Sequence, residues 1–150
     1  MSLKGLHRNY IKRRLRHNHQ FRGVVSRRVL QHVLGKHLQP QQSVILLHRH
    51  HYTSLVLAPN GKICFYFDPL GISRLSKNVL HMLRTLDVTT VYYNKKPVQS
   101  SQSDKCGLFC MYFVVENIRN PHQFQTFLNT FSTVSRKNDQ LVQYLLGRKI

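Results

Sequence analysis

Three side chains in this sequence are of the types that perform nucleophilic catalysis with a thiol. They are His51, Asp68 and Cys106, and a candidate amide donor, Gln99, lies just upstream of the cysteine. An imidazole deprotonates a thiol, a carboxylate orients the imidazole, and an amide N–H stabilises an oxyanion. The order and setting of these residues predict a peptide hydrolase that attacks through Cys106.

A β-hairpin is expected between the histidine and the aspartate. Asn60-Gly61 is the strongest short signal for a hairpin turn, because both positions tolerate positive φ, and apolar runs at residues 52–58 and 63–67 flank it. A two-residue turn at this point pairs Pro59 with Lys62. The two runs therefore form antiparallel strands.

The register of this hairpin places the histidine beside the carboxylate. Counting back from the turn, Leu57 faces Cys64 and Thr53 faces Asp68, so His51 becomes a diagonal neighbour of Asp68 on the same sheet face. Diagonal pairs lie about 7–8 Å apart at the backbone, a gap that these two side chains span. A bulge in either strand would undo this arrangement.

The cysteine opens a stretch that is expected to be a buried central helix. Residues 111–118 are too continuously apolar for a surface helix, which indicates a helix that begins near Cys106 and is covered on all sides. The amino end of a helix carries partial positive charge and unpaired N–H groups. These favour a thiolate at Cys106 and hold an oxyanion beside it, and Gln99 would add a side-chain donor.

Several short blocks of the sequence, in their order, resemble adenain, the adenovirus-type cysteine protease, and its relatives in other DNA viruses and virus-like transposons. The blocks are His51-Tyr52, residues 64–71 (CFYFDPLG), Gln99-Ser100 and residues 106–110 (CGLFC), with a weaker one at residues 21–25 (FRGVV). The resemblance covers roughly residues 21–118. Its specificity comes from several blocks in the right order, since no single block would carry it.

The resemblance implies a role for each site residue and a type of fold. His51 would be the general base, Asp68 its orienting acid, Cys106 the nucleophile and Gln99 part of the oxyanion hole. It also implies the adenain variant of the papain-like arrangement and cleavage after small, glycine-containing motifs.

This chain departs from the adenain pattern at three points. Tyr52 stands where adenain commonly has Trp, and Asp68 stands where many adenoviral enzymes have Glu; neither change breaks the mechanism. No cysteine before the glutamine block matches the one that pairs with an activating peptide in adenain. The sequence therefore offers no cysteine through which such a peptide would attach, and the need for a peptide activator stays open.

Each site residue also has a simpler interpretation. His48 and His50 compete with His51, although alternation points His50 to the opposite sheet face. Asp68 alone could start a turn, and Gln102 competes with Gln99 from a position that leaves less loop to fold back over the thiol. The other two cysteines fit the interior better, Cys110 in the helix core and Cys64 on a strand.

Charge is the second informative feature. The 150 residues include 23 Lys and Arg against five Asp and Glu, a formal net charge of +18 at pH 7. Lys and Arg contact phosphates and release counterions, which predicts a nucleic-acid partner without sequence readout; a solvated basic arm is the alternative. The cluster at residues 12–16 also resembles a nuclear-localisation signal. The candidate phosphate-binding residues are Lys4, Arg8, Lys12, Arg13, Arg14, Arg16, Arg22, Arg27 and Arg28.

Other classes of protein are disfavoured. Three cysteines without Cys-x-x-Cys spacing are typical of a reducing compartment rather than of a disulfide framework. The cluster at residues 48–51 lacks the ligand spacing of a zinc site, so no metal is expected. With no apolar amino-terminal core and no run of membrane length, the chain is expected to be soluble and intracellular.

The remaining pattern predicts one α+β domain over residues 21–150, with a small central β-sheet packed against helices, and a basic, mobile arm over residues 1–20. Asn120 is expected to cap a helix that starts at Pro121. Strands are predicted at 44–47, in the hairpin and at 88–93, and helices at 29–38, 75–86, 106–118, 121–131 and 141–146.

We therefore expect a viral cysteine endopeptidase that processes virion precursor proteins and requires no cofactor for its chemistry. We expect a monomer, associated with DNA as a candidate activator, in the host nucleus and the virion. Two alternatives stay open: an inactive nucleic-acid-binding virion or packaging protein with a protease-like fold, and a protease of ubiquitin-like proteins. A reactive thiol at Cys106 separates the first alternative from an active enzyme.

Overall fold

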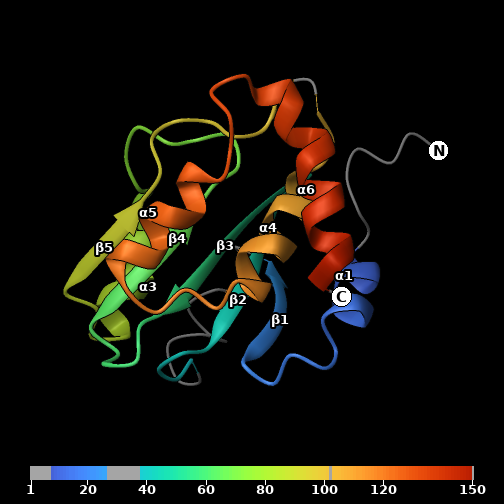
Figure 1. The fold of residues 1–150 in the computed structure, drawn as a ribbon. Coiled ribbons are helices and arrows are strands. Elements are labelled where there is room, and N and C mark those ends of the chain that lie inside the picture. Colours follow the sequence, from blue (N-terminus) through green and yellow to red (C-terminus); the bar gives the residue numbers. More distant parts are fainter. Residues whose placement is uncertain (1–7, 27–37, 102, 150) are drawn as a thin grey trace.

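A computed structural model describes residues 8–26, 38–101 and 103–149, and a five-stranded mixed sheet lies at its centre (Figure 1). The strands follow one another across the sheet in chain order, with β1–β2 and β4–β5 parallel and the two pairs between them antiparallel. They are β1 (Phe21–Ser26), β2 (Ser43–His48), β3 (His51–Leu57), β4 (Ile63–Phe67) and β5 (Thr90–Tyr93). The sheet therefore begins earlier than predicted, at β1.

Helices cover both faces of this sheet. Alternate strand residues point to opposite sides, so Ile45 packs into one apolar cluster with α1, α4, α5 and α6, whereas Leu46 packs into another with α3 (Figure 1). The helices are α1 (Arg8–Arg14), α3 (Lys77–Thr85), α4 (Cys106–Val115), α5 (Pro121–Asn129) and α6 (Ser135–Lys149). This is an α+β fold compatible with the adenain-type arrangement, as the sequence predicted.

The cysteine helix α4 is the central helix of the molecule. Eight of its ten residues are buried, because the sheet lies on one side and α5 and α6 on the other. Phe113 stacks on Phe67 of β4 and meets Phe127 of α5 edge-on. A helix with apolar residues all round is stable only when covered in this way, which confirms the predicted burial.

The hairpin has the predicted register but a different turn. Leu57 pairs with Cys64 as expected, yet the closing bond runs from the Ala58 N–H to the Ile63 carbonyl oxygen, at 2.8 Å, so four residues form the loop. Pro59 has no N–H to donate, so a two-residue turn closed by Pro59 and Lys62 would lack one of its two closing hydrogen bonds. Gly61 takes φ +72°, while Asn60 stays at negative φ.

The other helices match their predictions with changed ends. The Asn120 side chain accepts from the N–H of Gln123 at 2.8 Å, which confirms the predicted cap. The last helix is longer than predicted and begins at Ser135. The predicted helix at 29–38 lies, apart from Leu38, outside the described residues. No helix in the described part of the chain is long and apolar enough to cross a membrane.

The prediction of a mobile arm is wrong for residues 8–20. Residues 8–14 form helix α1, and Ile11 and Leu15 are 0% and 2% exposed within the same core cluster as α4 and α6. These two residues are four apart and so lie on one helix face, while the basic residues between them face outward. The high charge of the segment concealed this short apolar face.

We expect Ile11→Ala to lower the free energy of unfolding by about 2–4 kcal/mol, because it leaves a cavity in the core. Urea unfolding measures the change. Lys12→Ala, on the exposed face of the same helix, is the matched control and should change stability by less than about 0.5 kcal/mol. If the two variants were equally stable, Ile11 would not be part of the core, and the prediction of a mobile arm would stand.

Candidate active site

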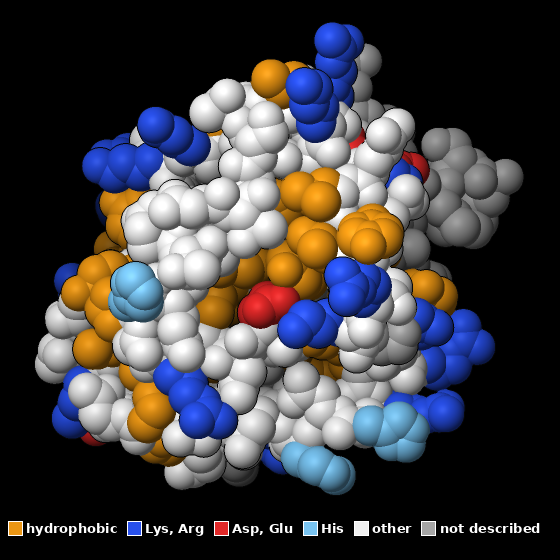
Figure 2. Space-filling model, in the orientation of Figure 1, with side chains coloured by type: hydrophobic (Ala, Val, Ile, Leu, Met, Phe, Trp, Pro, Cys, Tyr) orange, Lys and Arg blue, Asp and Glu red, His pale blue; other side chains and the backbone are white. Residues whose placement is uncertain are grey.

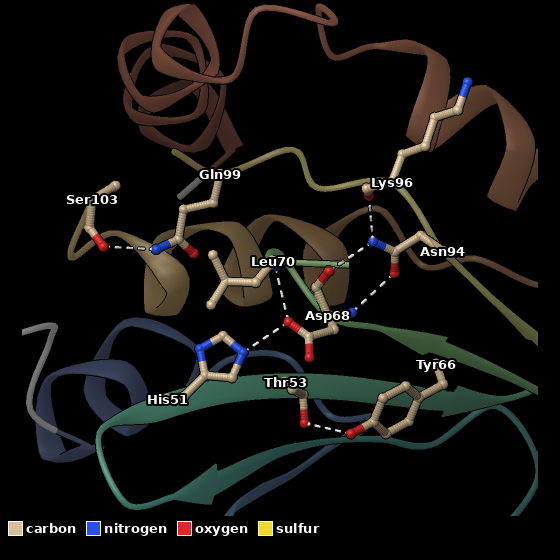
Figure 3. Close-up of polar contacts among 9 residues, drawn as sticks. All are labelled: His51, Thr53, Tyr66, Asp68, Leu70, Asn94, Lys96, Gln99 and Ser103. Carbon is tan, nitrogen blue, oxygen red and sulfur yellow. Dashed lines mark hydrogen bonds and ion pairs between the residues drawn. The ribbon is translucent and has the colours of Figure 1, made fainter. Parts of the chain in front are cut away.

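Three structural elements bring their ends together at the site, and Figure 3 shows two of the residues at these ends, His51 and Asp68. His51 is the first residue of β3, Asp68 directly follows β4, and Cys106 is the first residue of α4. The His51 Nε2 lies 2.7 Å from the Asp68 Oδ1, so the predicted contact between imidazole and carboxylate is confirmed. The Cys106 thiol also interacts with the His51 ring and contributes to the raised pKa of the imidazole. Since Nε2 is engaged by Asp68, Nδ1 is the atom left for the thiol.

The environment of His51 favours its protonated form. Burial alone would lower its pKa, but hydrogen bonds with Asp68 and Cys106 and the negative charges of these partners outweigh burial and raise the pKa of His51 to about 9. Asp68 is 8% exposed, so water screens this pair weakly. The imidazole is therefore expected to be protonated at neutral pH, and an imidazolium beside the sulfur favours a thiolate.

Cys106 lies at the electropositive end of α4. The thiol is buried, with 4% of the residue exposed, and Lys105 at the N-cap makes no side-chain hydrogen bond to the helix. The first-turn N–H groups of a helix have no partner within the helix. They lie beside the sulfur, where they are suited to hold negative charge on a bound oxygen.

Asn94 holds the backbone of Asp68, a role that no sequence pattern indicated. Its side-chain Oδ1 accepts from the Asp68 N–H at 3.0 Å, and its Nδ2 donates to the Asp68 carbonyl oxygen at 2.6 Å and to that of Lys96 at 3.1 Å (Figure 3). The amide thus continues the β4–β5 ladder with its side chain. Two residues that each follow a strand are brought together because these strands are parallel.

The turn after Asp68 is joined to the loop that carries Gln99. The Leu70 N–H donates to the Asp68 Oδ1 at 2.9 Å, and the Pro69 carbonyl oxygen accepts from the N–H groups of Val98 and Gln99, both at 2.9 Å. Gly71, at φ +71°, makes this approach possible, because a Cβ there would lie 2.5 Å from the Lys95 carbonyl oxygen. The acid and the amide donor therefore sit on one connected unit.

Gln99 itself points into the site and is almost completely buried. Its Nε2 donates to the Ser103 carbonyl oxygen at 2.8 Å, which leaves the second N–H of the amide for another acceptor (Figure 3). Its Oε1 is buried and has no hydrogen-bond partner among the described residues. The competing residue, Gln102, lies outside the described residues.

The amino-terminal part of α6 supports the Gln99 loop from behind. The Asn138 Nδ2 donates to the carbonyl oxygens of Val98, at 2.9 Å, and Ser132, at 2.8 Å, while its Oδ1 accepts from the Ser132 N–H at 2.7 Å. Next to it, Asp139 hydrogen-bonds with Ser100 and Ser103, and burial raises the pKa of its carboxyl group. Sequence patterns did not indicate these contacts, and the one between Asn138 and Val98 joins residues 40 positions apart.

The site opens into a cleft of about 690 Å³. His48 and His50 also line it, but Asp68 bonds with His51, so His51 is the histidine that the structure joins to the acid and the thiol. The lining residues are His48, Arg49, His50, His51, Leu70, Gln99, Ser101, Ser103, Asp104 and Cys106.

The other cysteines lie in the interior, as expected. Cys110 is fully buried one turn beyond Cys106, and Cys64 is fully buried on the α3 side of the sheet; burial raises the pKa of both thiols. All three cysteines are free thiols. The described residues contain no cluster of three or more potential metal ligands.

We expect Asn94→Ala to weaken the His51–Asp68 hydrogen bond, because the carboxylate loses its anchored backbone. In the wild type, the ring N–H proton in this hydrogen bond should give a downfield NMR resonance. This resonance should disappear in Asn94→Ala. Asn138→Ala is the matched control, since it removes an equally buried asparagine with three hydrogen bonds. Both variants should lose about 2–4 kcal/mol of stability, from buried groups left unpaired. A resonance that survives in both variants would contradict a positioning role for Asn94.

Comparison with known proteins places the chain in a family. Residues 17–145 match the family model described as adenovirus endoprotease. No curated protein matches the chain significantly. Among solved structures, the central domain of the uncharacterized Lpg1148 protein from Legionella pneumophila is similar at 14% identity and a TM-score of 0.45, over 87% of this chain and 88% of that one. Because the family model spans most of the sequence, the chain belongs to the adenovirus endoprotease family of cysteine proteases.

Proposed function

We propose that this protein is an active thiol endopeptidase, with Cys106 as nucleophile, His51 as general base and acid, Asp68 as orienting acid and Gln99 as oxyanion donor. The observation that carries the proposal is that His51 hydrogen-bonds with the Asp68 carboxylate and interacts with the Cys106 thiol, and that His51 and Cys106 line one cleft. Three groups from distant segments converge there in the relation that thiol hydrolysis requires.

The first half of the reaction forms an acyl-enzyme. In the resting pair His51 Nδ1 already carries the proton of the thiol, and the Cys106 Sγ, as a thiolate, attacks the carbonyl carbon of the scissile peptide bond. The Gln99 amide and the backbone N–H at the start of α4 donate hydrogen bonds to the resulting oxyanion. The imidazolium then gives its proton to the leaving amine, and the C–N bond breaks.

The second half restores the enzyme. His51, now neutral, takes a proton from water as the water attacks the thioester carbonyl, and the carboxylic acid product leaves as the Cys106 sulfur is released. Asp68 holds the ring through Nε2 in both halves, which keeps Nδ1 directed at the reacting atoms. No metal or organic cofactor is required by these steps.

The substrates we propose are virion precursor proteins cleaved after small, glycine-containing motifs, by a monomeric enzyme in the host nucleus and the virion. Family membership supports protein substrates of a viral protease. The open alternatives are a ubiquitin-like substrate and an inactive protein that has kept the fold.

We expect a peptide electrophile that ends in Gly-Gly to label Cys106 of the wild-type protein, with the adduct located by mass spectrometry. Cys106→Ala should abolish both labelling and proteolysis while its unfolding midpoint stays close to that of the wild type. Cys110→Ala removes a thiol one turn away that faces the core, and labelling should persist in this control.

Two results would count against an active enzyme. Undiminished proteolysis by Cys106→Ala would remove Cys106 as the nucleophile. An unreactive Cys106 in a folded protein that still binds DNA would favour the inactive alternative.

We further propose that the protein binds DNA through a basic surface formed by the exposed face of α1 and the residues that follow it as far as Arg22. Six of the candidate residues are described and all six are exposed: Arg8, Lys12, Arg13, Arg14, Arg16 and Arg22. Lys4, Arg27 and Arg28 lie outside the described residues. Figure 2 shows Lys and Arg side chains spread around one face of the molecule, on which acidic side chains are sparse. An ordered helix presents its charges in a fixed array, which suits contacts with backbone phosphates.

Because α1 is part of the core, this surface is best tested by substitution rather than truncation. Replacing Lys12, Arg13 and Arg16 together by Gln should weaken DNA affinity and reduce the slope of log K against log salt by about 3, since each lost phosphate contact contributes about 0.9. Fluorescence anisotropy with a labelled duplex across a salt series measures both.

The control replaces Arg74, Lys77 and Arg84 by Gln around α3, and equal effects of the two triple variants would contradict a specific role of α1.

A further inference from the structure

The turn between β2 and β3 places three basic residues at the edge of the catalytic cleft. His48 and His51 pair across the two strands, so Arg49 and His50 form the two-residue turn itself. His48, Arg49 and His50 are exposed, and all three line the cleft together with His51 and Cys106. The proposed mechanism gives none of these three a task.

Arg49 adopts a backbone conformation that favours glycine. Its φ is +57°, and among residues with a side chain this region suits Asn and Asp better than Arg. Strained residues of this kind gather at functional sites, where the side chain is required despite its conformational cost. If the turn only connected two strands, glycine at this position would make it more stable than arginine does.

The guanidinium of Arg49 also has no acidic partner within the described part of the chain. The ion pairs there join His51 with Asp68, Lys105 with Asp104, and Lys149 with Glu116. Asp104, the other acid that lines the cleft, lies on the loop before α4 and has Lys105 at 4.0 Å. The turn therefore presents an unpaired cation to whatever enters the cleft.

We infer that Arg49 forms a subsite for an acidic side chain of the substrate; this inference rests on the proposed endopeptidase function. Arg49 lies two residues from His51 and lines the same cleft as His51 and Cys106, so its side chain can reach substrate residues close to the cleaved bond. The planar guanidinium binds a carboxylate through two parallel hydrogen bonds. The preferred substrates thus carry Asp or Glu within about three residues of the cleaved bond.

The test is the cleavage-site profile of the full-length protein on a proteome-derived peptide library, with the products identified by mass spectrometry. The wild type should show Asp and Glu enriched about fivefold over Asn and Gln within three residues of the cut, the strength of a partly exposed ion pair. Arg49→Gly should abolish this enrichment while raising the unfolding midpoint by about 2–4 °C, because glycine relieves the strain.

Two further variants separate the role of Arg49 from a general effect of charge. Arg49→Glu should reverse the preference, so that Lys and Arg become enriched near the cut. Arg119→Gln removes the same charge from an exposed loop residue that does not line the cleft, and it should leave the acidic enrichment unchanged.

The contrary results are distinct from one another. Cleavage without acidic enrichment, or an enrichment that survives in Arg49→Gly, would overturn this inference and leave the endopeptidase function standing. An unchanged cleavage-site profile of Arg49→Gly, combined with weaker DNA binding by this variant, would also overturn the inference. It would assign the turn to the DNA-binding surface. Absence of cleavage of every peptide would instead contradict the proposed function and, with it, the inference.

Discussion

The hydrogen bond between His51 Nε2 and Asp68 Oδ1, 2.7 Å long, depends on a carboxylate that is fixed from several directions. The Asn94 side chain binds both backbone groups of Asp68, and the Leu70 N–H donates to its side chain. The same turn accepts two N–H groups from the Gln99 loop at Pro69. One short segment thereby sets the positions of the acid, the base and the oxyanion donor relative to α4. Rigid support of this kind keeps a catalytic group within the small range of positions in which the reaction proceeds.

This arrangement links the protonation of His51 to the stability of the fold. The pKa of His51 is about 9 in the folded protein, above its ordinary value of 6.5, so the folded state holds its proton more tightly than the unfolded chain does. The resulting stabilisation is complete below about pH 6.5 and is lost as the pH rises through about 9. The charge that prepares the thiol for attack is therefore also a charge that stabilises the site.

The parts of the fold that rest on local pattern could be predicted, and those that rest on tertiary contact could not. Counting back from Asn60-Gly61 gave the correct hairpin register, because the four-residue loop closed by Ala58 and Ile63 keeps the same pairing of β3 with β4 as a two-residue turn would. The turn itself was wrong since Pro59 lacks an N–H. The role of Asn94 depends on the parallel pairing of β4 and β5, and neither strand alone reveals it. Ile11 and Leu15 carried a helical spacing that the surrounding charge obscured.

The titration of His51, followed by NMR in the wild type and in Asp68→Asn, tests most directly whether the carboxylate controls the catalytic base. A neutral amide keeps the shape of the side chain but removes its charge, so the variant separates electrostatics from packing. In the wild type the imidazole should remain protonated until about pH 9, and in the variant its pKa should fall toward or below the ordinary 6.5. A His51 that titrates near 6.5 in both proteins would contradict the account.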